Sequence, residues 1–91
     1  MYCLKTFVRD RKGLHAVLAT MIATTARNHC AKIYITNLDN RRRANARSVL
    51  EILSLETAGG TPVQIVADGA EAEAAVCEIK KLVCSDAYSR A

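Results

Sequence analysis

The amino-acid sequence predicts an α+β fold, a two-layer open-faced sandwich in which three helices cover one face of a four-stranded antiparallel sheet. Two observations carry this prediction. Segments that alternate apolar and polar side chains, as half-buried strands do, are interspersed with segments whose apolar residues recur every three or four positions, as in amphipathic helices. Their order is strand, helix, strand, strand, helix, strand, helix. With 91 residues, of which 51% are hydrophobic, the chain has room for a single core.

The chain begins with a strand, a turn and a helix. Residues 4–8 alternate in the manner of a strand that ends at the turn-forming residues 10–13. Apolar residues then recur at helical spacing from residue 16 to residue 28. The first helix is therefore expected to begin immediately after His15.

A hairpin and a short helix follow. Residues 32–36 predict a second strand, and residues 41–45 a third, short and polar one, joined by the turn-rich residues 37–40. Ser48 precedes an apolar run and is followed three residues later by a glutamate, which is the spacing of a capping box. A short second helix is therefore expected over residues 49–53.

The last part of the chain predicts a strand and a helix. Residues 63–67 alternate as a fourth strand, in which Pro62 is tolerable only near the first residue or on an edge. Residues 70–83 predict a third helix, with glutamates near its start and lysines near its end. We expect one domain over residues 1–84 and a frayed tail over residues 85–91.

Charge and cysteine content limit the classes of function. Residues 1–54 hold ten Lys or Arg against three Asp or Glu, whereas residues 55–91 hold three against six. Such a basic first half favours acidic partners. No apolar run of about 20 residues and no secretory signal occurs, so we expect a cytoplasmic protein that neither spans nor binds a membrane. The cysteines form no metal-binding pattern; we expect reduced thiols in or near the core, no metal and no cofactor. They are Cys3, Cys30, Cys77 and Cys84.

His15 is the main candidate for chemistry. The first N–H groups of a helix have no intrahelical acceptor, and the helix dipole adds about half a positive charge there. A phosphoryl group on His15 would meet the backbone N–H groups of Ala16 and Val17. The alternative is a histidine that merely caps the helix. His29, near the end of the same helix, is interpreted as structural.

The sequence Gly-Leu-His-Ala-Val-Leu-Ala at residues 13–19 resembles the histidine-containing phosphocarrier protein (HPr) family of the bacterial phosphotransferase system, whose usual pattern is Gly-(Leu/Ile)-His-Ala-Arg-Pro-Ala. The likeness extends over nearly the whole chain, including residues 44–48, residues 53–55 and the Gly-Gly link. It implies the same fold and a carrier that is not itself a catalyst. His15 would accept a phosphoryl group from phosphorylated enzyme I and pass it to enzyme IIA-type proteins.

Two positions depart from the family pattern. Val17 stands where the family has its phosphate-assisting arginine, and Leu18 where it has proline. Charge-assisted hydrogen bonds from a guanidinium are worth about 1.5–3 kcal/mol each, so their loss corresponds to roughly tenfold to a hundredfold in stabilisation. Arg11 or Lys12 can compensate as a point charge, or both can simply face solvent.

The resemblance also implies a regulatory serine and a docking surface. Ser48 is either a plain helix N-cap or, as in Gram-positive relatives, the target of an HPr serine kinase. The expected surface for enzyme I and enzyme IIA consists of apolar residues with a basic rim. Its candidates are Val17, Leu18, Met21, Arg47, Val49, Leu50 and Leu53.

Two other functions are compatible with parts of the sequence. The first is a regulatory HPr-like docking module with weak or no histidine phosphotransfer, which Val17 favours and which phosphorylation of Ser48 could gate. The second is RNA binding through the arginine-rich residues 41–47. We do not expect nucleic-acid binding, because no Gly-x-x-Gly clamp occurs and the aromatic residues form no stacking pattern on adjacent strands. These residues are Tyr2, Phe7, Tyr34 and Tyr88.

Overall fold

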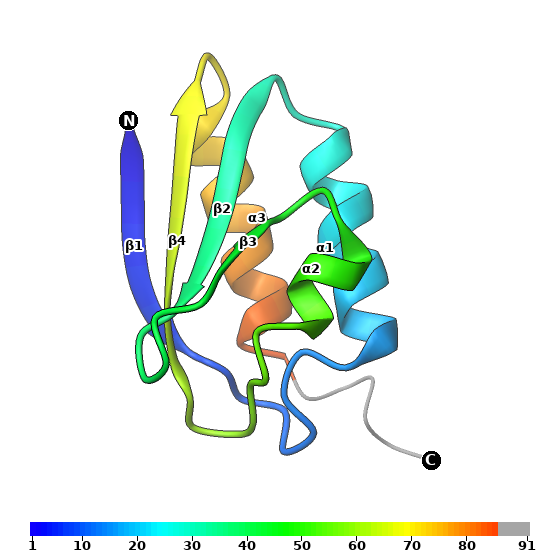
Figure 1. The fold of residues 1–91 in the computed structure, drawn as a ribbon. Coiled ribbons are helices and arrows are strands. Elements are labelled where there is room, and N and C mark those ends of the chain that lie inside the picture. The colour runs from blue at the N-terminus through cyan, green and yellow to red at the C-terminus, as the bar shows by residue number, and fades with distance from the viewer. Residues whose placement is uncertain (86–91) are drawn as a thin grey trace.

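The computed structural model, which describes residues 1–85, has the predicted order of elements, and its three helices lie on one face of the sheet (Figure 1). The strands are β1 (Tyr2–Phe7), β2 (Ala31–Asn37), β3 (Arg43–Asn45) and β4 (Pro62–Gly69). The helices are α1 (Ala16–Arg27), α2 (Val49–Leu53) and α3 (Ala72–Val83). No described helix is both long and apolar enough to cross a membrane.

The sheet is antiparallel throughout, with the strand order β1-β4-β2-β3. One row of the register joins Leu4, Ile65, Ile35 and Ala44 across all four strands. These residues point toward the helices, and the last three are fully buried. The opposite face carries the more polar residues of each strand, so the predicted two-layer α+β fold with one open face is confirmed.

The third strand is shorter than predicted, because turn chemistry occupies its first two residues. The side chains of Asn37 and Asn40 accept hydrogen bonds from the backbone N–H groups two residues ahead, at 2.9 Å each. Arg41 adopts a left-handed backbone conformation with φ of 64°. Pairing with β2 therefore starts only at Arg43.

The fourth strand begins at Pro62, so proline occupies the first position, as expected. The last helix begins at Ala72, two residues later than predicted. The side chain of Glu71, at its N-cap, makes no capping bond and instead contacts His29. Apart from Ser85, the predicted tail lies outside the described residues.

The cysteine prediction was wrong in one respect. All four thiols are free, but Cys3, Cys30 and Cys77 are exposed, and only Cys84 is half-buried. Cys3 projects from the open face of the sheet because it alternates with the helix-facing residues of β1. The core is instead built from aliphatic side chains and alanines of both layers.

Candidate functional site

His15 occupies the N-cap of α1, directly before the first helical residue. Its carbonyl accepts the N–H of Ala19 at 2.8 Å, while its imidazole makes no capping bond and is 19% exposed. The N–H groups of Ala16 and Val17 have no acceptor within residues 1–85. The ring therefore lies at the positive end of a twelve-residue helix, beside unused backbone donors.

A buried carboxylate lies beside the His15 ring. Asp10 is fully buried, and its Oδ2 lies 3.1 Å from Nε2 of His15. Its Oδ1 accepts the backbone N–H of Lys12 at 2.9 Å. An ionised carboxylate only accepts hydrogen bonds, so a neutral His15 ring that pairs with it does so through Nε2–H and keeps the lone pair on Nδ1. Nδ1 has no hydrogen-bond partner in the described part of the chain.

The loop that carries Asp10 and His15 is fastened to the link between α2 and β4. Gly13 has φ of 73°, and a Cβ at this position would lie 2.0 Å from the carbonyl oxygen of Thr57. The next residue, Leu14, donates its N–H to Oγ1 of Thr57 at 2.8 Å. Only glycine fits here, since both the backbone angle and the close approach exclude a side chain.

Sequence reasoning missed both Asp10 and Thr57 as parts of the site. Asp10 was placed in a turn, where aspartate is common, and the turn forms: Gly13 N–H bonds to the Asp10 carbonyl at 2.8 Å. The available signal was an aspartate at the start of a tight turn shortly before the histidine. Thr57 gives no such signal, because it is 43 residues from its partner Leu14.

The proposed compensating cations do not contact the histidine. Arg11 and Lys12 are exposed, and neither side chain forms an ion pair or hydrogen bond with His15. Lys12 contributes its backbone N–H, to Asp10, rather than its ammonium group. Val17 projects into solvent with half of its surface exposed, so an arginine would be accommodated there without repacking.

The candidate docking residues divide into exposed and buried groups. Val17, Leu50 and Leu53 are 50%, 80% and 40% exposed, and Met21 and Val49 are half-buried. Helices α1 and α2, which carry these apolar side chains, pack against each other. Leu18 was wrongly included: it is fully buried, because its side chain points from the first turn of α1 into the protein.

Arg47, the candidate for the basic rim, is exposed, and its guanidinium lies at the far end of α1 from His15. Its guanidinium donates to the carbonyls of His29 at 2.8 Å and Ala31 at 3.0 Å, beyond the C-terminal end of α1. That end is about 18 Å from the N-terminal end, since α1 has twelve residues and each rises 1.5 Å. Arg47 therefore ties the start of α2 to the start of β2.

Ser48 forms half of the predicted capping box. Its Oγ accepts the N–H of Glu51 at 3.3 Å, as expected for an N-cap. The carboxylate of Glu51, however, accepts the N–H of Asn45 at 3.0 Å and not that of Ser48, whose N–H bonds to the Asn45 carbonyl. The reciprocal bond is absent because the chain turns back at Asn45 before α2 begins.

His29 has different surroundings from His15. Its Nδ1 lies 2.9 Å from Glu71 and its Nε2 lies 2.7 Å from Glu78. The hydrogen bonds to Glu78 and then to Glu71 raise the pKa of His29, and the bond to His29 lowers the pKa of Glu71. The ring links the end of α1 to α3, which agrees with the structural interpretation. Residues 1–85 contain no group of three ligand side chains arranged to hold a metal.

Comparison with known proteins finds phosphocarrier proteins and multiphosphoryl transfer proteins among the relatives of this chain. A family model described as "PTS HPr component phosphorylation site" matches residues 4–85. The phosphocarrier protein NPr of Shewanella violacea is 38% identical over 74 residues, which cover 81% of this chain and 79% of that protein. The multiphosphoryl transfer protein of Escherichia coli O157:H7 is 37% identical over 70 residues, or 76% of this chain.

The match spans only 19% of that multiphosphoryl transfer protein. Among solved structures, HPr-C-His of Thermoanaerobacter tengcongensis superposes with a TM-score of 0.87 at 25% identity, covering 100% of this chain and 99% of that one. The family match over nearly the whole described chain agrees with the element order and with a histidine at the start of α1. The chain belongs to the HPr family of phosphocarrier proteins of the phosphotransferase system.

Proposed function

We propose that the protein accepts a phosphoryl group on Nδ1 of His15 from phosphorylated enzyme I, in the cytoplasm, and passes it to an enzyme IIA-type acceptor. The observation that carries this proposal is the pairing of Nε2 with Asp10 at 3.1 Å. It occupies one ring nitrogen and leaves the other with a lone pair, beside the unused donors of α1. The protein acts as a carrier and does not turn over a substrate by itself.

In the transfer step, the Nδ1 lone pair attacks the phosphorus of the donor. An N–P bond forms on His15, and the donor's bond to phosphorus breaks, with its electron pair returning to the donor. The imidazole becomes cationic, and the buried carboxylate of Asp10 stabilises that charge. The N–H groups of Ala16 and Val17 bind the phosphoryl oxygens, with Arg11 and Lys12 as nearby positive charges.

Partner docking is assigned to the exposed apolar side chains of α1 and α2. Val17 lies two residues from His15, and Leu50 and Leu53 extend the surface along α2. Apolar side chains exposed to this degree on a small domain favour an interaction surface. Ser48 remains a candidate for phosphorylation by a serine kinase. It is only half-buried, and it lies at the N-cap of α2, where the helix dipole favours negative charge.

The test is transfer of labelled phosphate from phosphoenolpyruvate through a cognate enzyme I. Wild-type protein should acquire one acid-labile, base-stable label, and His15→Ala should acquire none. His29→Gln is the matched control, because it removes the other histidine and should leave labelling intact. Labelling of His15→Ala, or no labelling of the wild type by an enzyme I that labels its own carrier, would refute the proposal.

A further inference from the structure

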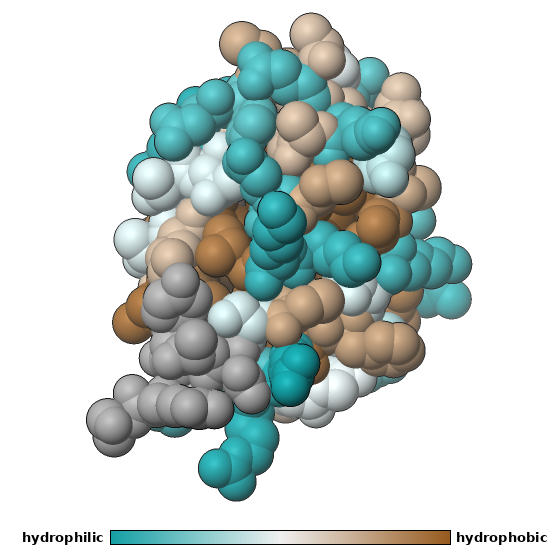
Figure 2. Space-filling view, turned by 180° about the vertical axis from the view of Figure 1, so that it is seen from behind, coloured by the Kyte–Doolittle hydropathy of each residue, from teal (hydrophilic) through white to brown (hydrophobic). Residues whose placement is uncertain are grey.

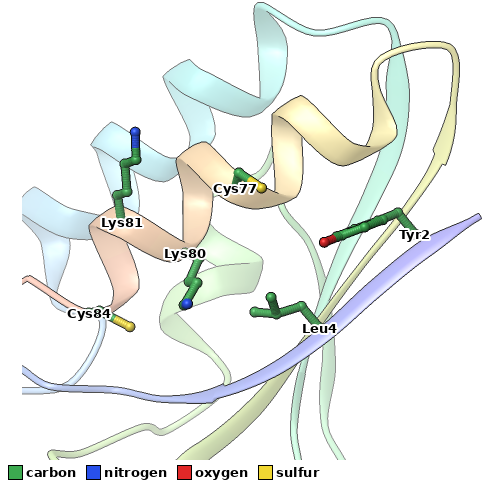
Figure 3. A pocket seen from close by; sticks show the side chains of 6 residues that line it. All are labelled: Tyr2, Leu4, Cys77, Lys80, Lys81 and Cys84. Carbon is green, nitrogen blue, oxygen red and sulfur yellow. The ribbon is translucent and has the colours of Figure 1, made fainter.

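A hollow between β1 and α3 contains none of the residues assigned to phosphoryl transfer. It has a volume of about 450 Å³ and is lined by Tyr2, Leu4, Cys77, Lys80, Lys81 and Cys84. This volume lies in the range of about 300–1,000 Å³ that is typical of ligand sites. Tyr2 and Leu4 extend from β1 toward α3, and Lys80 extends from α3 toward Leu4 (Figure 3).

The hollow combines apolar walls with positive charge. Within residues 1–85, Lys80 and Lys81 are exposed and form no ion pair, and none of the residues that line the hollow carries a carboxylate. The helical side of the molecule shows hydrophobic side chains directly beside hydrophilic ones (Figure 2). A complementary ligand would place apolar side chains against Tyr2 and Leu4 and negative charge near the lysines.

The strand beside the hollow has a free edge. β1 is the outermost strand of the sheet and pairs only with β4 among the described residues. Val8 directs its N–H and C=O toward Thr61 and Gly60, whereas the N–H of Arg9 turns away, to Val83. Along an edge strand, the backbone N–H and C=O groups of successive residues point alternately toward the neighbouring strand and away from it. Cys3 and Lys5 are an even number of residues from Arg9, so their N–H and C=O groups also face away from β4.

From these two features we infer that the edge of β1 and the hollow together form a docking site for an extended acidic segment of another protein. The segment adds a strand next to β1, bonded to Cys3 and Lys5. Its alternate side chains then enter the hollow beside Tyr2 and Leu4, since strand side chains project to opposite faces at every second residue. Its carboxylates pair with Lys80, which extends toward the β1 side, and Lys81 adds to the positive potential from the other side of α3 (Figure 3).

This site is separate from His15, so both can act at once. The proposal adds a second interaction surface to the carrier and does not depend on phosphoryl transfer. A free edge is also a place where two copies of a chain can pair, and the test below distinguishes that outcome.

The probe is a blocked seven-residue peptide that alternates valine and glutamate, titrated into the ¹⁵N-labelled protein. Saturable amide shifts are expected at Cys3, Lys5, Lys80 and Lys81 and not at His15. The double variant Lys80→Gln/Lys81→Gln should bind at least tenfold more weakly, because it removes the unpaired charges. Lys32→Gln, which removes an exposed lysine from β2, is the matched control and should bind like the wild type.

Two altered peptides separate charge from strand pairing. Replacing the glutamates by glutamines should weaken binding at least tenfold, and N-methylation at every second residue should abolish it. The proposal is overturned by the absence of saturable shifts in β1, by equal binding of the glutamine or N-methylated peptides, or by unchanged binding of the double lysine variant. Concentration-dependent self-association through β1 without peptide would assign the edge to a second copy of the chain and likewise overturn it.

Discussion

His15 and His29 flank the same helix, α1, and each ring lies beside a carboxylate. The two rings differ in how many of their nitrogens have a hydrogen-bond partner. Asp10 contacts one nitrogen of His15. Glu71 and Glu78 contact both nitrogens of His29, from the start and the middle of α3. A histidine needs one unoccupied nitrogen to act as a nucleophile, whereas a ring held at both nitrogens serves as a cross-link. Counting the partners of each nitrogen therefore distinguishes a ring that has a nitrogen free for chemistry from a ring that serves as a cross-link.

The largest effect is expected from Asp10→Asn. The amide oxygen still accepts the N–H of Lys12, so the amide N–H₂ faces His15 and donates to Nε2. This places the imidazole proton on Nδ1 and removes the nucleophile, and we expect transfer from enzyme I to slow by about 100-fold or more. Rapid-quench transfer kinetics measure the rate, and ¹⁵N shifts of the ring report the tautomer.

Glu71→Gln is the control for Asp10→Asn, since it makes the same chemical change beside the other histidine. Its transfer rate should equal that of the wild type. If Asp10→Asn transfers at the wild-type rate, or if Glu71→Gln slows transfer equally, the distinction between the two histidines fails.

The next effect is expected from Val17→Arg, which restores the guanidinium that the family pattern places beside the phosphoryl group. Charge-assisted bonds of about 1.5–3 kcal/mol each should raise the transfer rate by about one to two orders of magnitude. Val17 is half exposed, so the melting temperature should hardly change. Val17→Gln, which adds length without charge, is the control.

An unchanged rate in Val17→Arg, together with a large loss in Arg11→Ala or Lys12→Ala, would assign the arginine's task to the preceding turn. If none of these variants changes transfer and phosphorylation is undetectable throughout, the domain is a docking module.

The His29 cross-link makes stability depend on pH. The pKa of His29 is raised, so the stability from its charged form is fully present below the ordinary histidine pKa of 6.5 and is lost as pH rises through the folded-state pKa. The pKa of Glu71 is lowered, so its contribution is present above the ordinary value of 4.5 and is lost as pH falls through the folded-state pKa.

The free energy that the cross-link contributes should therefore be greatest between pH 4.5 and pH 6.5. Urea unfolding from pH 4 to pH 9 measures it, with His29→Gln as the reference that lacks the cross-link. Stability curves that run parallel for the two proteins across this range would contradict the assignment.

The smallest effect is expected at Ser48. Ser48→Ala removes the N-cap acceptor of α2 and should cost about 1 kcal/mol of unfolding free energy. Ser48→Asp retains a capping oxygen and adds negative charge, so it should preserve stability and weaken binding to enzyme I. Calorimetric titration at low salt checks the second effect: an unchanged dissociation constant would leave Ser48 as a cap only.

The features that are determined by residues adjacent in the sequence were predictable. The start of α1 after His15 and the cap of α2 at Ser48 follow from neighbouring residues, and the structure places both as expected. The errors arose where side chains bond outside their own element. Glu71 bonds to His29 and does not cap α3, which begins two residues later than predicted, and Glu51 bonds to Asn45 and not to Ser48.

The site was only partly predictable for the same reason. The position of His15 and the exposure of Val17 are local consequences of helix geometry, and both were expected. The pairing with Asp10 depends on how the loop of residues 10–15 closes, and its support from Thr57 depends on a contact between distant segments. Periodicity carries no information on such contacts. The docking residues were inferred from the family resemblance, which included Leu18 although its side chain is buried.

The close fit of Gly13 against Thr57 has a consequence for the order of events during synthesis. The histidine segment leaves the ribosome more than forty residues before the link that holds it, since Thr57 is 43 residues beyond Leu14. β4, which occupies the middle of the sheet, emerges later still. A growing chain therefore displays its histidine without the loop geometry that orients the ring. The geometry that orients His15 is therefore complete only once the chain has been made past Thr57 and β4.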